Sequence, residues 1–346
     1  MMTNDPPALA VVVPCYNEES VLPETLRQLL LTRASLVREG RITEESQLYF
    51  VDDGSRDRTW ALIEQFAATE RCVYGIKLSR NNGHQNAVLA GLFHAAGDAI
   101  VTVDADLQDD IAVLPEMVSH YLNGYDVVYG VRNRRPNDSW FKRVTAEGYY
   151  RVLAAMGANV VFNHADCRLM SRRAIDALKD YGEVNLFLRG IVPTIGFPSA
   201  IAYYDRRERF AGESKYSLRK MLALAVDGIT SFSTVPLRMI AALGLFIFVV
   251  SLALSAWVLW IRLFTDQSVP GWASLTLPIY LMSGIQLLSV GILGEYVAKI
   301  YMETKRRPRY FVERIVTSGN PVPDARRWAG SRFPAGDGVG PPRDGT

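Results

Sequence analysis

Short apolar runs alternate with longer stretches of helical periodicity in the N-terminal part of the chain. Each run ends in polar or acidic residues, as buried strands of a sheet do, and the stretches between them repeat apolar residues at the spacing of an amphipathic helix. The predicted strands are Leu9–Val13, Leu48–Val51, Ala99–Val103 and Asp126–Tyr129, and the predicted helices are Val21–Leu36, Thr59–Ala68, Asn86–Ala96 and Ile111–Leu122. This alternation predicts an α/β fold with a doubly wound sheet.

Two uncharged stretches farther along the chain predict a pair of membrane helices. Met239–Ile261 and Trp272–Gly294 contain no Asp, Glu, Lys or Arg, and at about 1.5 Å per residue each is long enough to cross a bilayer core of about 30 Å. The alternative is a pair of buried core helices, which rarely follow one another in soluble proteins. Basic residues flank the pair on its outer sides, which places both termini in the cytoplasm by the positive-inside rule.

Composition narrows the class of protein. The chain has 346 residues, of which 49% are hydrophobic and 21% charged, so a folded core is expected. The net charge of +2 argues against a dedicated nucleic-acid binder. One basic stretch, 132–143, is interleaved with aromatic residues, and beside the predicted membrane helices it favours a membrane surface over a nucleic acid. The three cysteines, Cys15, Cys72 and Cys167, have no metal-ligand or CxxC spacing, which indicates a reduced compartment.

Polar and acidic turns directly follow three of the predicted strands. They are Pro14–Glu18, Asp52-Asp53 and Asp104–Gln108. No GxGxxG follows the first strand and no P-loop motif occurs, which argues against a dinucleotide dehydrogenase and against a P-loop NTPase. Carboxylates at the carboxyl ends of strands instead suggest a hard cation, because Mg²⁺ or Mn²⁺ is usually held by one or two carboxylates together with substrate phosphates.

Five motifs together resemble glycosyltransferase family 2. VVVPCYNEE, VDDGSRDRT, NNGHQNAVLAGL, VDADLQDD and GESKY follow one another in the order of that family, and residues 9–310 resemble its branch that glycosylates polyprenyl phosphates. The resemblance implies a Rossmann-like GT-A domain followed by a two-helix transmembrane hairpin. The organisation it implies is 1–216 for the GT-A domain, 217–238 for an amphipathic segment, 239–264 and 272–297 for the membrane helices, 265–271 for an external loop, and 298–346 for a basic cytoplasmic segment with a disordered tail.

The same resemblance implies a role for individual residues of the site. The implied nucleotide-binding residues are Pro14, Tyr16, Glu18 and Asp53. The implied metal ligands, for Mg²⁺ or Mn²⁺, are Asp106 and Gln108, and the implied catalytic residues are Asp104 and Asp166. The implied binders of phosphate or acceptor are Arg132, Arg134, Arg209 and Lys215.

Several of these residues also fit a purely structural role. Tyr16 could instead be a packing aromatic, and Asp53 could cap the helix that begins at Thr59 or shape an Asx-turn, which DGS sequences favour. Asp166 is equally interpretable as the partner of an arginine in a structural ion pair, with Arg168, Arg172 and Arg173 as the candidates. His84 and His164 are interpreted as hydrogen-bonded structural residues, not as bases.

The resemblance implies a membrane enzyme that moves a sugar onto a lipid. The expected reaction is inverting transfer of glucose from UDP-glucose to undecaprenyl phosphate at the cytoplasmic face of a bacterial inner membrane, by a homo-oligomer that is tetrameric in parts of the family. One alternative is a polysaccharide synthase, but Arg327-Trp328 lacks the glutamine of the QxxRW motif that those enzymes carry. The other is a non-catalytic membrane scaffold, against which the intact Asp53, Asp104 and Asp106 argue.

Overall fold

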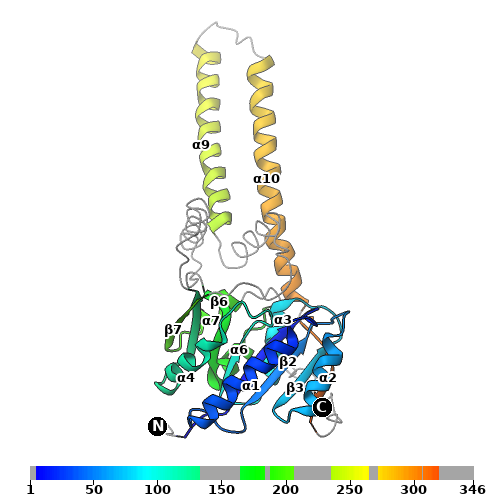
Figure 1. Ribbon diagram of the computed structural model, residues 1–346. Coiled ribbons are helices and arrows are strands. Elements are labelled where there is room, and N and C mark those ends of the chain that lie inside the picture. The colour runs from blue at the N-terminus through cyan, green and yellow to red at the C-terminus, as the bar shows by residue number, and fades with distance from the viewer. Residues whose placement is uncertain are drawn as a thin grey trace, which may run out of the picture.

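The computed structural model describes residues 5–132, 164–183, 188–205, 235–264, 272–305 and 307–318. In these ranges the chain forms one eight-stranded sheet with helices packed on both faces, which we call the head, and two long helices that extend away from it (Figure 1). The strands are β1 Leu9–Cys15, β2 Gln47–Asp52, β3 Val73–Leu78, β4 Ala99–Thr102, β5 Val127–Arg132, β6 His164–Ser171, β7 Ser199–Tyr204 and β8 Val312–Thr317.

The sheet is mixed, in the order β7-β5-β6-β4-β1-β2-β3-β8. Strands β3, β2, β1 and β4 are parallel. Strands β1, β2, β4 and β5 coincide with the four predicted strands, whereas β3, β6, β7 and β8 were not predicted. Strand β6 is antiparallel to both β4 and β5, and β8 is antiparallel to β3. The α/β prediction is therefore confirmed, while the doubly wound parallel sheet is only half of the structure, because β6 reverses direction beside β4.

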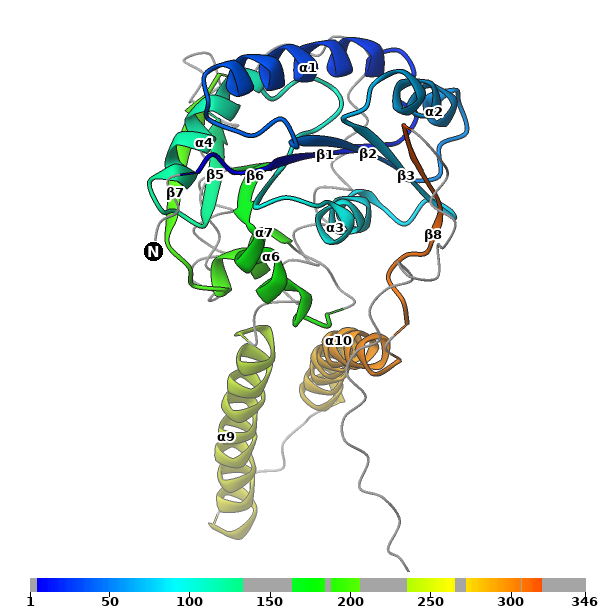
Figure 2. The same cartoon turned by 90° about the horizontal axis from the view of Figure 1, so that it is seen from below.

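Helices cover both faces of this sheet (Figure 2). On one face lie α1 Leu22–Arg38, α2 Thr59–Thr69 and α4 Leu114–Leu122, with the 3₁₀ turn η1 Ile111–Val113, and on the other lie α3 His84–His94, α6 Arg172–Lys179 and α7 Leu188–Thr194. Side chains of β1 alternate between the two cores: Val11 and Val13 pack with the first group, and Ala10 and Val12 with the second. Both faces of a central strand are buried in this way, which explains why it reads as an unbroken apolar run.

Helix α3 lies unusually close to the sheet. A Cβ atom added at Gly91 would stand 2.2 Å from Cγ1 of Val12 on β1 and 3.1 Å from Cγ2 of Val51 on β2. Only a residue without a side chain permits this approach. The close packing fixes the position of the whole helix, including its first residue, His84.

The chain returns to the head after its last long helix. Strand β8 pairs with β3 at the sheet edge, and Lys77 and Arg314 make ion pairs of 3.0 Å with Glu313 and Glu64, respectively. The C-terminal segment 298–346, predicted to be a basic region with a disordered tail, thus contributes a strand to the sheet. The remainder of the tail, 319–346, and most of the predicted amphipathic segment 217–238 lie outside the described residues.

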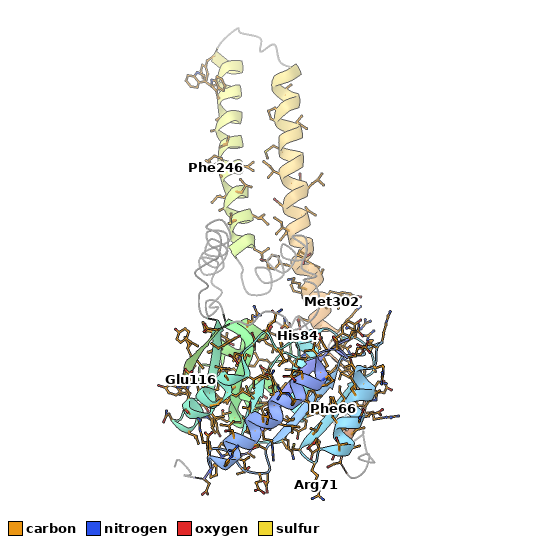
Figure 3. The ribbon with its side chains drawn as sticks, viewed as in Figure 1. Phe66, Arg71, His84, Glu116, Phe246 and Met302 are labelled. Carbon is orange, nitrogen blue, oxygen red and sulfur yellow. The ribbon has the colours of Figure 1, made fainter. Side chains whose placement is uncertain are left out.

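Helices α9 Val235–Phe264 and α10 Trp272–Thr304 coincide with the two predicted membrane helices. They extend from the same end of the head, and large apolar side chains such as Phe246 and Met302 are exposed along them (Figure 3). By length and composition, however, only one stretch of the described residues, Ile285–Thr304, qualifies as a candidate membrane span. The two predicted helices are therefore present. The prediction that both cross a membrane is not supported by length and composition for α9. Helix α10 also continues to Thr304, past residue 297, where the second span was expected to end.

Replacement of Gly91 by alanine tests the close contact of α3 with the sheet. The new methyl group would overlap Val12, and we expect a loss of about 1–3 kcal/mol in the free energy of unfolding because a packed core cannot absorb the extra volume. Thermal unfolding in detergent measures this. Gly291→Ala on α10, where no atom lies within 4 Å of the added Cβ, is the control. Equal melting temperatures for the two variants would contradict the contact.

Candidate active site

A cavity of about 290 Å³ opens at the carboxyl ends of β1, β2 and β4. Its described lining includes seven residues predicted for the site: Pro14, Tyr16, Glu18, Asp53, Asp104, Asp106 and Asp166. The other lining residues are Cys15, Asn81, Gly83, His84, Ala87 and Ala105. Ligands of open α/β sheets bind at this edge, so the cavity is the candidate active site.

The topology of the sheet explains why these residues meet. The parallel strands β1, β2 and β4 all end at one edge, so the turns that follow them are neighbours. Because β6 is antiparallel to β4, its first residues lie at the same edge, and Asp166 on β6 comes to line the cavity with Asp104. Asp166 is thus brought to the site by β6, a strand that the hydrophobic pattern did not predict.

Two loops that are hydrogen-bonded to each other form one wall. The Asn17 N–H donates to Oγ of Ser55 at 3.0 Å, and the Arg56 N–H donates to Oδ1 of Asn17 at 2.9 Å. Asn17 has a positive φ of 56°, a conformation that asparagine tolerates better than most residues. The wall carries Tyr16, which is 42% exposed and lines the cavity.

Asp53 holds the start of α3. Its Oδ1 accepts the N–H of Asn82 at 2.7 Å and its Oδ2 accepts the N–H of Gly83 at 2.9 Å. The residue is only 2% exposed, and burial raises the pKa of its carboxyl while these two N–H groups oppose the shift. Asp53 lines the cavity and is at the same time the tie between β2 and α3. Both structural alternatives for Asp53 are wrong, because the N–H of Thr59 donates to Asp57 and the N–H of Ser55 donates to Asp52.

Two carboxylates face each other across the imidazole of His84. Nε2 of His84 lies 3.6 Å from Oδ1 of Asp104 and 3.7 Å from Oδ2 of Asp166. Burial raises the pKa of Asp104 to about 7; His84 opposes the shift, and the negative charges of Asp166, Asp109 and Asp106 add to it. The sequence-based interpretation of His84 as a structural residue is therefore incomplete, because its ring is 44% exposed and lines the cavity.

Asp166 is paired with an arginine that the sequence did not suggest. Nε and one terminal nitrogen of Arg189, on α7, donate to Oδ1 and Oδ2 of Asp166, both at 2.9 Å. Burial opposes ionisation of Asp166, but this bidentate pair outweighs it and lowers the pKa of the carboxyl well below its usual range.

The three arginines considered from sequence lie elsewhere. Arg168 is buried and stacks over the ring of Tyr129, contributing only at longer range to the ionisation of Asp166. Arg172 donates to the carbonyl oxygens of Gly97 and Ala95, and Arg173 pairs with Asp126. Asp166 does form an ion pair, as the structural alternative held, but with Arg189 and with none of the three arginines named for it.

The turn after β4 contains the two residues predicted to bind a metal ion. Asp106 lines the cavity, and its Oδ1 accepts the N–H of Gln108 at 3.1 Å. Gln108 is only 6% exposed and is not among the lining residues. Leu107 between them has a φ of 55°, a conformation that a leucine adopts only where the surroundings impose it. The turn is thus a constrained one at the cavity floor.

The donor set of the cavity fits a hard divalent cation. Asp104 and Asp106 line the cavity with carboxylate oxygens, whereas both oxygens of Asp166 are bound by Arg189; the crowding of these charges contributes to the raised pKa of Asp104. In the described part of the chain, no group of three His, Cys, Asp or Glu side chains is placed to hold a metal ion. Mg²⁺ does not require three protein ligands, because substrate phosphates and water complete its coordination.

The remaining predicted site residues are placed only in part. Arg132 is the last residue of β5, and His164, considered from sequence, is the first of β6. Arg134, Arg209 and Lys215 lie outside the described residues. Two residues of the site, His84 and Arg189, were missed from the sequence. His84 lies inside a quoted motif, NNGHQNAVLAGL, which is a signal that could have identified it, whereas nothing in the sequence around Arg189 distinguishes it.

Comparisons with known proteins agree on one family. The model of the family described as "Glycosyl transferase family 2" matches residues 10–179. A Bacillus subtilis protein described as the uncharacterized glycosyltransferase YkoT is 48% identical over 314 residues, which cover 90% of this chain and 93% of the relative. An Escherichia coli K12 protein, the prophage bactoprenol glucosyl transferase homolog, is 37% identical over 311 residues, covering 89% of this chain and 99% of the relative.

A solved structure was also found. The mannosyltransferase PcManGT from Pyrobaculum calidifontis, in complex with GDP-Man and Mn²⁺, is 16% identical, with 88% of this chain and 89% of that chain covered. Its TM-score of 0.43 is too low to carry an inference about ligands.

Asp53→Asn tests the tie between β2 and α3. An asparagine can accept only one of the two N–H donors and turns its own NH₂ toward the other, so we expect about 1–3 kcal/mol of lost stability. Chemical unfolding measures the loss, and hydrogen exchange at Asn82 and Gly83 locates it. The matched control is Asp98→Asn, since exposed Asp98 accepts a single N–H, from Ala8, that asparagine can keep. Unchanged exchange at both amides in Asp53→Asn would refute the tie.

Proposed function

The chain belongs to glycosyltransferase family 2 and is a glycosyltransferase, and from this premise we propose that it transfers glucose from UDP-glucose to undecaprenyl phosphate. The transfer inverts the anomeric centre, depends on Mg²⁺ or Mn²⁺ and takes place at the cytoplasmic face of a bacterial inner membrane. Family membership sets aside the alternative of a non-catalytic scaffold.

The proposal of a lipid acceptor rests on the similarity of this chain to proteins described as bactoprenol glucosyl transferases. Relatives with that description are 37% identical to this chain, and the match covers 99% of their length. Similarity on this scale includes the two long helices as well as the head. A protein that shares both parts with such relatives is proposed to share their class of acceptor, a polyprenyl phosphate.

The placement of the cavity supports an acceptor held in a membrane. Figure 3 shows His84, which lines the cavity, at the end of the head from which α9 and α10 extend. If those helices cross a bilayer, the cavity faces the membrane surface, where the phosphate of a polyprenyl lipid is found. We therefore retain the two-helix hairpin and the cytoplasmic termini as part of the proposal. A homo-oligomer, tetrameric by resemblance to the family, also belongs to it.

The donor is proposed to occupy the cavity with its base near Tyr16. The exposed ring of Tyr16 offers a stacking surface, and Pro14, Glu18 and Asp53 line the same wall. Asp106 is proposed to hold the divalent ion; Gln108, the second ligand implied by the sequence, is buried outside the cavity lining and is left out of the proposal. When bound, such an ion supplies positive charge that stabilises the departing diphosphate. Arg132, Arg134, Arg209 and Lys215 are proposed to bind the phosphates of donor or acceptor.

The chemistry requires little from a general base. An oxygen of the acceptor phosphate forms a bond to the anomeric carbon while the bond from that carbon to the UDP oxygen breaks, and UDP leaves with the electron pair. A phosphate monoester has a second pKa of about 6, so the acceptor is mostly a dianion at neutral pH. Asp166, whose pKa is lowered by Arg189, is a poor proton acceptor. We propose that Asp104 and Asp166 orient the reacting groups.

Asp106→Asn tests the metal assignment and the reaction together. In membranes supplied with UDP-glucose, undecaprenyl phosphate and Mn²⁺, we expect on the order of a thousandfold loss of glucose transfer, because the leaving diphosphate loses its counter-charge. Metal-dependent binding of UDP should also disappear. Asp110→Asn, in the same loop but outside the cavity lining, is the control, as asparagine caps η1 as well as aspartate does. Full activity in EDTA would exclude the metal, and no transfer from any UDP-sugar by the wild type would exclude the reaction.

The proposed topology predicts the location of both ends of the chain. Reporter domains fused before Asp5 and after Thr317 should both report a cytoplasmic location, because β8 must lie on the same side of the membrane as β3 to pair with it. A fusion within 265–271 should report the periplasm. A periplasmic reading at either end, or a cytoplasmic reading in the loop, would rule out the hairpin.

A further inference from the structure

We propose that Arg189 is a positioning residue for sugar transfer: it holds the carboxylate of Asp166 at one orientation in the cavity wall. The proposal rests on the proposed function, in which Asp166 lies at the reacting centre. It assigns to α7 a part in the reaction that neither the motifs nor the relatives indicate.

The geometry of the pair carries the inference. Arg189 approaches Asp166 with two nitrogens, each 2.9 Å from a different carboxylate oxygen. A guanidinium that binds both oxygens fixes the plane of the carboxylate, which a single charge at the same distance would leave free to rotate. If charge compensation alone were required, buried Arg168, two residues away on the same strand, would supply part of it. The fork therefore sets orientation as well as charge.

The backbone around the pair is held from both sides. Oγ of Thr102 on β4 donates to the carbonyl oxygen of Asp166 at 2.6 Å, which fixes the main chain of β6. The N–H of Leu188, next to Arg189, donates to Oε1 of Gln85 at 2.9 Å. Gln85 follows His84 on α3, so the segment that carries Arg189 is tied to the helix that carries the other neighbour of Asp166.

These contacts form a closed arrangement of three elements. Asp166 projects from β6, Arg189 reaches it from α7, and His84 contacts it from α3 at 3.7 Å. The hydrogen bond between Leu188 and Gln85 links α7 to α3, so each of the three elements is connected to the other two. The side of Asp166 that faces the cavity thus stays directed toward Asp104, across the ring of His84.

The head contains a matched pair that serves as a control. Arg173 binds both oxygens of Asp126 in the same forked manner, and Asp126 is buried. Asp126 directly precedes β5, which is antiparallel to β6, and the start of β5 pairs with the end of β6. The second pair therefore lies at the other ends of the strands from the cavity, which adjoins the start of β6. Loss of either fork removes a similar structural contact, but only one of them adjoins the candidate active site.

The experiment is a double-mutant cycle on purified full-length protein in detergent, with UDP-glucose and saturating undecaprenyl phosphate. The variants are Arg189→Gln, Arg189→Lys, Asp166→Asn, the double variant Arg189→Gln/Asp166→Asn, and Arg173→Gln as the control. We expect Arg189→Gln to lower kcat about 100-fold with little change in KM for the donor, because a misplaced reacting group costs about that much. Arg189→Lys should recover only part of kcat, since it restores the charge without the fork.

Non-additivity identifies a residue that acts through another. In the Asp166→Asn background, Arg189→Gln should cause no further loss of kcat. Arg173→Gln should lower the melting temperature and leave kcat and KM at the wild-type values, which separates loss of a structural fork from loss of this one.

The outcomes distinguish this proposal from the function on which it rests. Losses of kcat that multiply in the double variant would overturn the positioning role, as would wild-type kcat in Arg189→Gln or full recovery in Arg189→Lys. If Asp166→Asn is slow while Arg189→Gln is not, only the role of Arg189 fails. If Asp166→Asn keeps the wild-type kcat, the proposed place of Asp166 at the reacting centre fails as well. If Arg189→Gln does not fold, the comparison of Arg189→Lys with Asp166→Asn decides the matter in the same way.

Discussion

The electrostatic cost of gathering carboxylates at one edge of the sheet is the constraint on which the rest of the structure depends. Asp53, Asp104, Asp106 and Asp166 all line one cavity, and each negative charge there makes the next one harder to ionise. Three of these carboxylates are accommodated in different ways. Asp53 receives two backbone N–H groups, Asp166 receives a guanidinium fork, and Asp104 is left with the imidazole of His84 at 3.6 Å and a pKa raised to about 7.

Helix α3 and the residues before it contribute to the stabilisation of all three carboxylates. The residues before it occupy both oxygens of Asp53, its first residue lies between Asp104 and Asp166, and its second residue ties it to α7. It can serve all three only because Gly91 lets it lie against β1 at a distance that a side chain would prevent. A helix that is packed tightly into the hydrophobic core is therefore also the element that organises the polar site.

The overall arrangement places this site in relation to the long helices. In chain order, α9 and α10 stand between β7 and β8, which are the two outermost strands of the sheet. Pairing of β8 with β3 ties the chain that follows α10 to the head. His84, which lines the cavity, lies at the end of the head from which both helices extend (Figure 3).

What the sequence determined by itself is local: burial on both faces of a strand, the amphipathic period of a helix and the acidic turns of the site. Four strands, the helices between them, and seven residues of the cavity follow from such patterns, because burial and turn chemistry leave their mark on neighbouring residues. Only the tertiary structure decided the direction of β6, the pairing of Asp166 with Arg189, the position of His84, the burial of Gln108 and the return of β8. Each of these joins residues that are distant in the chain, and which distant charges or strands become neighbours depends on the order and direction of strands in the sheet, a property that no local pattern encodes.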